Sequence, residues 1–73
     1  MRIEGKVVYM PLEGGFWGVV DVDGNEWLPL EMADELKKDC LRVILEVRKA
    51  KDVFSMFNWG TPVKILSFQV SDR

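Results

Sequence analysis

Short runs in which apolar and polar residues alternate are the feature that most limits the fold of this sequence. An alternation with a period of two puts the apolar side chains on one face of a β-strand. Glycine and proline separate the runs and predict turns between them. The predicted strands are 3–10, 16–22, 26–28, 41–48 and 63–70. A chain of 73 residues has the size of one domain, so we expect a single domain over residues 1–73.

The phase of each alternation predicts which side chains share the apolar face of a strand. These faces are Ile3, Gly5, Val7 and Tyr9 in the first strand, Phe16, Gly18, Val20 and Val22 in the second, and Leu41, Val43, Leu45 and Val47 in the fourth. We expect these faces to turn inward, which leaves Trp17 and Val19 outward. In the last strand the adjacent apolar residues Ile65 and Leu66 break the alternation, and they predict a β-bulge.

One segment has helical rather than strand-like spacing. Leu30, Ala33 and Leu36 recur at every third position, with acidic residues early and basic residues late, which suits the dipole of a helix. The segment begins without a Ser, Thr, Asp or Asn that would cap it. A helix of two or three turns is unstable alone and must pack against other elements. We therefore predict a short helix over 30–38 that plugs one end of a barrel.

The order of these elements predicts the fold class. Three strands, a short helix and two further strands are typical of a mainly β protein, a small five-stranded OB-like Greek-key barrel with one short helix between the third and fourth strands. Closing the barrel removes exposed strand edges. An SH3-like barrel also has five strands, but it usually carries only a short helical turn near its end. The place of the helix therefore favours the OB-like barrel.

The residue content excludes several classes of function. The chain has no His, which excludes Ser–His and Cys–His dyads and His metal ligands. Cys40 is the one cysteine, so an internal disulfide and a cysteine-based zinc site are excluded as well. With 10 Lys+Arg and 12 Asp+Glu the net charge is −2, which gives no general attraction to nucleic acid or to an anionic membrane. We expect no enzymatic activity, no cofactor and no metal.

The sequence also predicts a cytoplasmic protein. Residues 1–6 carry charge, but no apolar segment follows them as in a signal peptide. No apolar run approaches the roughly 18 residues of a transmembrane helix. A lone thiol is typical of a reducing compartment.

Four motifs lie in order along nearly the whole chain. They are Glu13-Gly14-Gly15-Phe16-Trp17-Gly18-Val19-Val20, Asp23-Gly24, Leu36-Lys37-Lys38-Asp39 and Trp59-Gly60-Thr61-Pro62-Val63-Lys64-Ile65-Leu66. Together they resemble a group of short uncharacterised prokaryotic OB-like proteins. The resemblance implies a small OB-like β-barrel and no assigned activity. The group usually has glycine after Lys-Lys-Asp, where this chain has Cys40. If that position needs a positive φ, Asp39 or an altered cap must take the strain.

Three groups have both a functional and a structural interpretation, and the structural one is favoured for each. The run Asp21-x-Asp23-Gly24-Asn25-Glu26 is similar to part of a calcium loop, but its glycine comes too early and it lies between strands, which favours a hairpin turn. Cys40 has no base to activate it, which favours a half-buried apolar residue. Glu13 is a candidate acid or base beside Phe16 and Trp17, but we expect its carboxylate to hold the loop through hydrogen bonds.

Aromatic residues supply the candidate binding surface. OB-folds bind ligands on the face of the second and third strands and on the adjoining loops, which here include 49–62. The candidate residues are Trp17, Val19, Phe57 and Trp59. Outward aromatic side chains can stack on bases or form a hot spot for a protein partner. The alternative is that the loop folds back so that its aromatic residues cover the core, and for Trp59 we favour this structural role.

A basic cluster at the start of the same loop allows a second function. Arg48, Lys49 and Lys51 are suited to phosphate contacts in a single-stranded nucleic-acid-binding protein. Carboxylates on the same expected face oppose this interpretation: Asp21, Asp23 and Glu26. We therefore expect a small non-enzymatic binding module for a protein or a small ligand, with nucleic acid as the alternative. We expect no membrane partner, and a monomer or a weak homo-oligomer.

Overall fold

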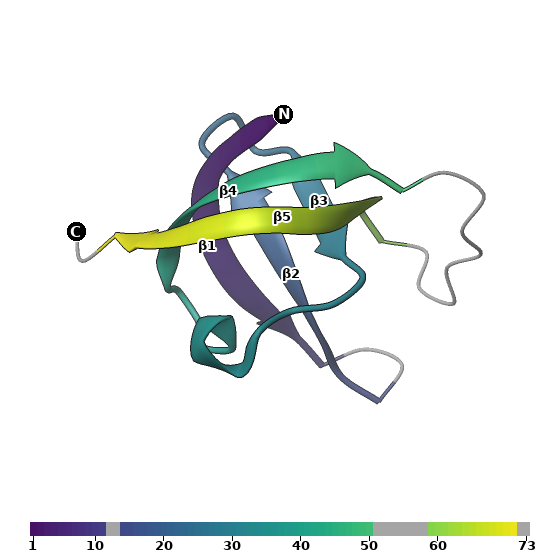
Figure 1. Ribbon diagram of the computed structural model, residues 1–73. Helices are drawn as coiled ribbons and strands as arrows, with labels where there is room; N and C mark the ends of the chain where they lie inside the picture. Colours follow the sequence, from purple (N-terminus) through teal and green to yellow (C-terminus); the bar gives the residue numbers. More distant parts are fainter. Residues whose placement is uncertain (12–13, 51–58, 72–73) are drawn as a thin grey trace.

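The alternating segments form five strands in the described part of the chain, together with one turn of 3-10 helix, in the computed structural model shown in Figure 1. The structure describes residues 1–11, 14–50 and 59–71. The strands are β1 (Arg2–Met10), β2 (Phe16–Asp21), β3 (Glu26–Pro29), β4 (Arg42–Lys49) and β5 (Thr61–Ser71), and the 3-10 turn is η1 (Asp34–Leu36).

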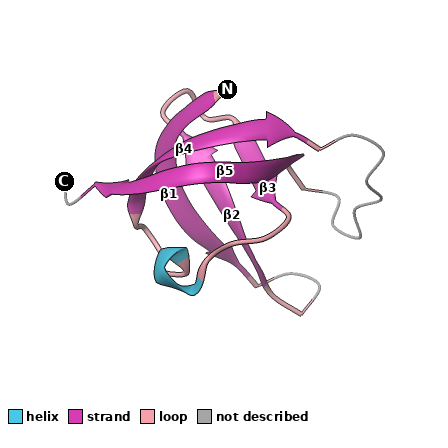
Figure 2. Cartoon of the chain, viewed as in Figure 1, coloured by secondary structure: helices cyan, strands magenta, loops and turns pink. Residues whose placement is uncertain are grey.

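The five strands close into a barrel in the order β1-β2-β3-β5-β4. Figure 2 shows them wrapped around one interior, with η1 at one end. Neighbouring strands run antiparallel except β3 and β5, which are parallel. The structure therefore confirms the predicted fold class, a mainly β, OB-like Greek-key barrel.

Closure depends on β1, which pairs with two strands. Its first half pairs with β4 and its second half with β2, and Gly5 belongs to both ladders. A Cβ atom at Gly5 would collide with the backbone of Val20 and would lie 2.7 Å from the Cα atom of Asp21. Only glycine therefore permits the close approach of β1 and β2 at the point where the barrel closes.

The core contains residues from four strands and η1. It consists of Ile3, Val7, Val19, Leu36, Val43, Leu45, Val47 and Val63. The predicted inward faces of the first and fourth strands are confirmed by the burial of Ile3, Val7, Val43, Leu45 and Val47. Tyr9 is an exception, because it lies beyond the core at the end of β1 and is exposed.

The predicted phase of the second strand is wrong. Val19, predicted to face outward, is 0% exposed and belongs to the core, and Trp17 packs against that core. Val22, predicted to face inward, is 75% exposed. Phe16 and Gly18 are buried, but they lie on the outer side of β2. They are buried there because Trp59 lies against both.

The predicted helix over 30–38 is only the single turn η1. Leu36 is 1% exposed and enters the core, as expected of a plug, whereas Leu30 is 44% exposed and Ala33 is also exposed. The residue before η1 is Ala33, which offers no side-chain hydrogen bond to its first turn. An uncapped segment of this length stays helical only where packing holds it, and here Leu36 supplies that packing.

Two local predictions are confirmed. Val47 pairs with Ile65 and Glu46 with Ser67, so Leu66 is the additional residue of a β-bulge. The run after β2 is a hairpin turn, in which the Gly24 N–H donates to the Asp21 carbonyl at 3.0 Å and Gly24 has a φ of 86°.

Candidate binding surfaces

The outer face of β2 is covered by the chain itself. The rings of Phe16 and Trp59 lie 5.6 Å apart between centroids and are tilted by 58°. A Cβ atom at Gly18 would collide with the same indole ring. Phe16 is consequently buried although it lies outside the main core. Trp59 thus has a packing role, on the outer side of β2 rather than over the interior.

The structure separates the predicted aromatic site residues. Trp17 is half-buried on the inner side of β2, with its ring edge-on to Tyr9 at 5.0 Å between centroids. Val19 is in the core, and its prediction as a surface residue is wrong. Trp59 lies on the opposite side of β2. The three described residues of the predicted patch therefore share no common surface. The fourth, Phe57, lies outside the described residues.

The basic residues form a larger group than the sequence indicated. Arg48 and Lys49 are exposed at the end of β4, Lys64 lies opposite Arg48 on β5, and Lys51 is outside the described residues. Cross-strand partners point to the same side of a sheet. The outer face of β1, β4 and β5 therefore carries the following cations, which we call the basic face: Arg2, Lys6, Arg42, Arg48 and Lys64.

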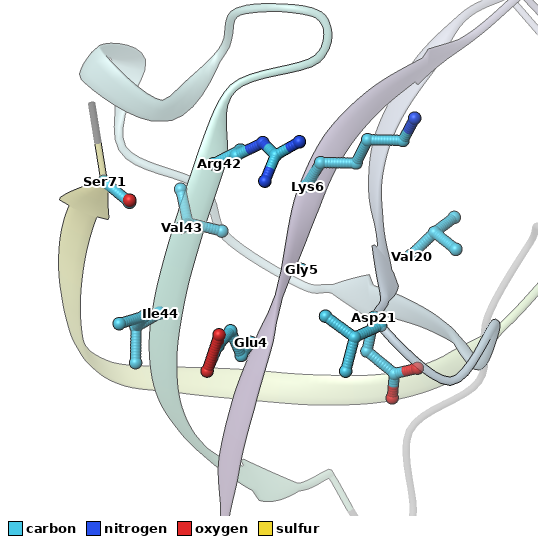
Figure 3. A pocket seen from close by; sticks show the side chains of 10 residues that line it. Glu4, Gly5, Lys6, Val20, Asp21, Arg42, Val43, Ile44 and Ser71 are labelled. Carbon is cyan, nitrogen blue, oxygen red and sulfur yellow. The ribbon is translucent and has the colours of Figure 1, made fainter. Parts of the chain in front are cut away.

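A shallow groove of about 270 Å³ crosses the basic face. Figure 3 shows Lys6 on β1 and Arg42 on β4, which are cross-strand partners, with Val20 on one side of the groove and Ile44 on the other. Two carboxylates, those of Glu4 and Asp21, also line the groove. A further carboxylate of the basic face, Glu46, accepts a hydrogen bond of 3.1 Å from the N-terminal ammonium group.

A larger groove, of about 820 Å³, lies between β5 and residues 30–37, and we call it the β5 groove. The large apolar residues that line it are Leu30, Met32, Leu36, Ile65, Leu66 and Phe68. Leu66 is 55% exposed and Phe68 is 38% exposed, although both are large apolar residues. The sequence did not predict this groove, because a full helix over 30–38 would have covered it. The missing helix cap was the available signal.

The backbone of β5 has a free edge at this groove. β3 pairs with β5 only from Thr61 to Val63, and the Leu30 N–H then donates to the Val63 carbonyl at 3.0 Å. β4 pairs with the opposite edge of β5 as far as Ser71. Within the described residues, no strand pairs with the groove-facing edge of β5 from Lys64 to Val70.

Cys40 differs in two ways from what was expected. It is exposed rather than half-buried, and its backbone has a positive φ of 67°. The position therefore does require the conformation that glycine adopts most easily, and Cys40 itself adopts it. Its N–H donates to the Val7 carbonyl at 2.7 Å, and its thiol lies 3.6 Å from an oxygen of Asp39.

Asp21 organises the hairpin between β2 and β3. Its carboxylate accepts hydrogen bonds from the Trp27 indole N–H and from the Asp23 and Asn25 backbone N–H groups, each at 2.9 Å. The hydrogen bond from Trp27 is the largest influence on the pKa of Asp21 and lowers it. Desolvation raises this pKa by less, and the bonds from Asn25 and Asp23 lower it further, so the pKa lies below the ordinary value. In the described part of the chain, no three His, Cys, Asp or Glu side chains are placed to hold a metal ion.

Comparisons of the chain with protein-family models, with curated proteins and with solved structures find no match. The resemblance of the four sequence motifs to the prokaryotic group therefore stays a prediction. No helix among the described residues is long and apolar enough to cross a membrane. The fold and the two grooves define this chain as a small OB-like β-barrel with a partly uncovered apolar surface beside β5.

Proposed function

We propose that this protein is a small non-enzymatic binding module whose partner is another protein, bound at the β5 groove. The observation that carries the proposal is the exposure of Leu30, Leu66 and Phe68 around one groove of about 820 Å³. Clustered apolar surface of this kind marks interaction sites in folded proteins, and the volume is in the range of roughly 300–1,000 Å³ for ligand sites.

The β5 groove is not the binding surface expected from the sequence. The face of β2 and β3 was the first candidate, but Trp59 lies on it and Val19 is buried beneath it. The 49–62 loop contributes Trp59 to packing, and residues 51–58 lie outside the described residues. A binding role for Phe57 stays a prediction.

A non-enzymatic role is supported by the chemistry of the available side chains. The chain has no His, and its one thiol, Cys40, lies beside the carboxylate of Asp39 rather than beside an imidazole. A cytoplasmic location also stays a prediction from the single cysteine.

Selection of displayed peptides tests the proposal. Random peptides are selected on the wild-type protein, and their affinity is then measured on Leu66→Ser and on Val22→Ser. Both substitutions replace an exposed apolar residue, but only Leu66 lines the β5 groove. We expect binding to Leu66→Ser to be at least about tenfold weaker, and binding to Val22→Ser to be unchanged. Failure to select any peptide, or equal affinity for both variants, would contradict the proposal.

Single-stranded nucleic-acid binding is the second candidate, and the basic face is the observation that favours it. Lys6 and Arg42 lie directly opposite each other on β1 and β4, where like charges destabilise a sheet unless an anion is bound. We expect fluorescence anisotropy with a labelled oligonucleotide to show binding that weakens steeply with salt and with Arg42→Ala. Lys38→Ala, which removes a cation outside the basic face, is the matched control. No binding at low salt would end this alternative.

A further inference from the structure

We propose that the partner enters the β5 groove as an extended peptide that pairs with the free edge of β5, and that this peptide is apolar at alternate positions and basic between them. The inference rests on the proposed function and specifies its partner. Addition of a strand to a sheet edge is an established mode of peptide recognition, in which backbone hydrogen bonds supply affinity and alternate side chains supply specificity.

The course of the chain around β5 leaves room for one more strand. β3 runs parallel to the start of β5, and the bond from Leu30 to Val63 is the last between them. After it, residues 30–33 diverge from β5 and lead to η1, as Figure 1 shows. β5 continues to Ser71 with β4 on its other side. An incoming peptide would lie in line with β3, in the position that a longer β3 would occupy.

The lining of the groove shows that the edge of β5 faces it. Consecutive residues from Ile65 to Phe68 all line the groove. Leu66 is the bulged residue, but Ser67 lies opposite Glu46 on the outer face and Phe68 lies opposite Leu45 on the inner face, so a surface that is lined by both must include the backbone edge. Such an edge presents N–H and C=O groups in register for another strand.

Apolar side chains line both walls of the groove, and we therefore infer that the peptide is apolar at alternate positions. Leu66 and Phe68 lie on the β5 side, and Leu30 and Met32 on the other. Leu36, which is buried in the core, also contributes to the lining. One face of an extended peptide would contact these residues, while its other face would remain near solvent.

The charges along residues 30–37 explain the basic residues of the peptide. Glu31, Asp34 and Glu35 are exposed on this segment. Glu31 and Lys37 line the groove, and Lys37 forms an ion pair of 3.3 Å with Asp34, which leaves the carboxylate of Glu31 without an ion pair among the described residues. The β5 wall offers Ser67, which is uncharged. Lys or Arg on the solvent face of the peptide would therefore meet uncompensated negative charge.

The test uses a synthetic peptide of alternating lysine and valine, acetyl-Lys-Val-Lys-Val-Lys-Val-Lys-amide. Two further versions carry N-methyl groups either on the valine amides or on the inner lysine amides. Alternate amides of a strand point to the same edge, so one version loses its hydrogen bonds to β5 and the other keeps them. We expect one methylated peptide to bind at least about tenfold more weakly than the parent and the other to bind within about threefold.

Amide chemical shifts in NMR spectra of the full chain locate the peptide. We expect the peptide to change the amide chemical shifts of residues 64–70. We also expect binding to weaken at least about tenfold in Leu66→Ser but not in Val22→Ser. The inference is overturned if the β5 amides do not respond to the parent peptide, or if both methylated peptides bind like the parent. Concentration-dependent shifts of β5 without peptide would instead identify a second copy of this chain as the occupant.

Failure of this inference can be distinguished from failure of the proposed function. If the selected peptides require Leu66 but are helical when bound, the β5 groove is still a protein-binding site. Only the inference that the peptide adds a strand to β5 is then overturned. Absence of any peptide that depends on Leu66 would overturn both.

Discussion

At the scale of single residues, Cys40 occupies a backbone conformation that costs energy. A residue with a Cβ atom in the left-handed region is less stable than glycine by roughly 1–2 kcal/mol, and Cys40 has a φ of 67°. The conformation is held by the Cys40 N–H, which donates to the Val7 carbonyl at 2.7 Å and ties the end of the 30–41 segment to β1. The strain expected at this position is therefore carried by Cys40 itself rather than by Asp39.

Replacing this residue with glycine should stabilise the protein. We expect Cys40→Gly to raise the free energy of unfolding by about 1 kcal/mol, because relief of the left-handed strain exceeds the added entropy of the unfolded chain. For a domain of this size, that gain corresponds to an increase in Tm of about 4–8 °C. Cys40→Ala, which also removes the thiol but keeps Cβ, should give no increase. Equal Tm values for the two variants would show that the backbone is not strained.

Asp21 is the second residue whose effect on stability can be isolated. Hydrogen bonds from Trp27, Asn25 and Asp23 lower its pKa in the folded state. A depressed pKa means that the unfolded chain binds the proton more readily, so the contribution of Asp21 is complete above the ordinary Asp pKa of about 3.9. It is lost as the pH falls through the lower folded value.

Substitution of Asp21 should therefore change the acid dependence of stability. We expect Asp21→Asn to lower the free energy of unfolding more at pH 7 than at pH 2, measured by urea titration with tryptophan fluorescence. Asp23→Asn is the matched control, since it removes the same charge from the same hairpin without removing the acceptor of these bonds. A loss from Asp21→Asn that is equal at both pH values would contradict the assignment.

At the scale of elements, β2 shows where sequence periodicity is insufficient. Both of its faces are largely buried, the inner one by the core and the outer one by Trp59. Alternation alone cannot tell which face turns inward when a residue far along the chain covers the other. Phe16 and Gly18 therefore gave the wrong phase, whereas β4 has charged residues on its outer face and gave the right one.

The packing of Trp59 on Gly18 can be measured as a coupling between the two residues. We expect Gly18→Ala to lower the free energy of unfolding by about 1–3 kcal/mol, because the added Cβ occupies the place of the indole ring. In a Trp59→Ala background the same change should be neutral or stabilising by about 0.5 kcal/mol, since alanine is better than glycine in a strand. The four proteins form a double-mutant cycle. Additive effects would show that Trp59 does not lie over Gly18.

At the scale of the whole molecule, the closed barrel was predictable and its uncovered side was not. Strand order follows from local patterns and turns, such as the hairpin at Gly24 and the bulge at Leu66, which neighbouring residues determine. The β5 groove depends instead on two distant features, the short pairing of β3 with β5 and the reduction of 30–38 to one turn. Neither feature has a local signal beyond the missing cap before η1.

The contribution of the 30–38 segment to the stability of the barrel should come mainly from Leu36, with a smaller part from Met32, which is partly buried against the same core. Leu36 is the residue of η1 that enters the core, and Leu30 lies partly in solvent beside the β5 groove. We expect Leu36→Ala to lower the free energy of unfolding by about 2–5 kcal/mol, a large part of the roughly 4–11 kcal/mol available to a chain of this length. Leu30→Ala should cost less than about 1 kcal/mol. Equal losses from the two substitutions, measured by urea titration, would mean that the segment packs as the continuous helical stripe predicted from the sequence, and that the β5 groove is covered in solution.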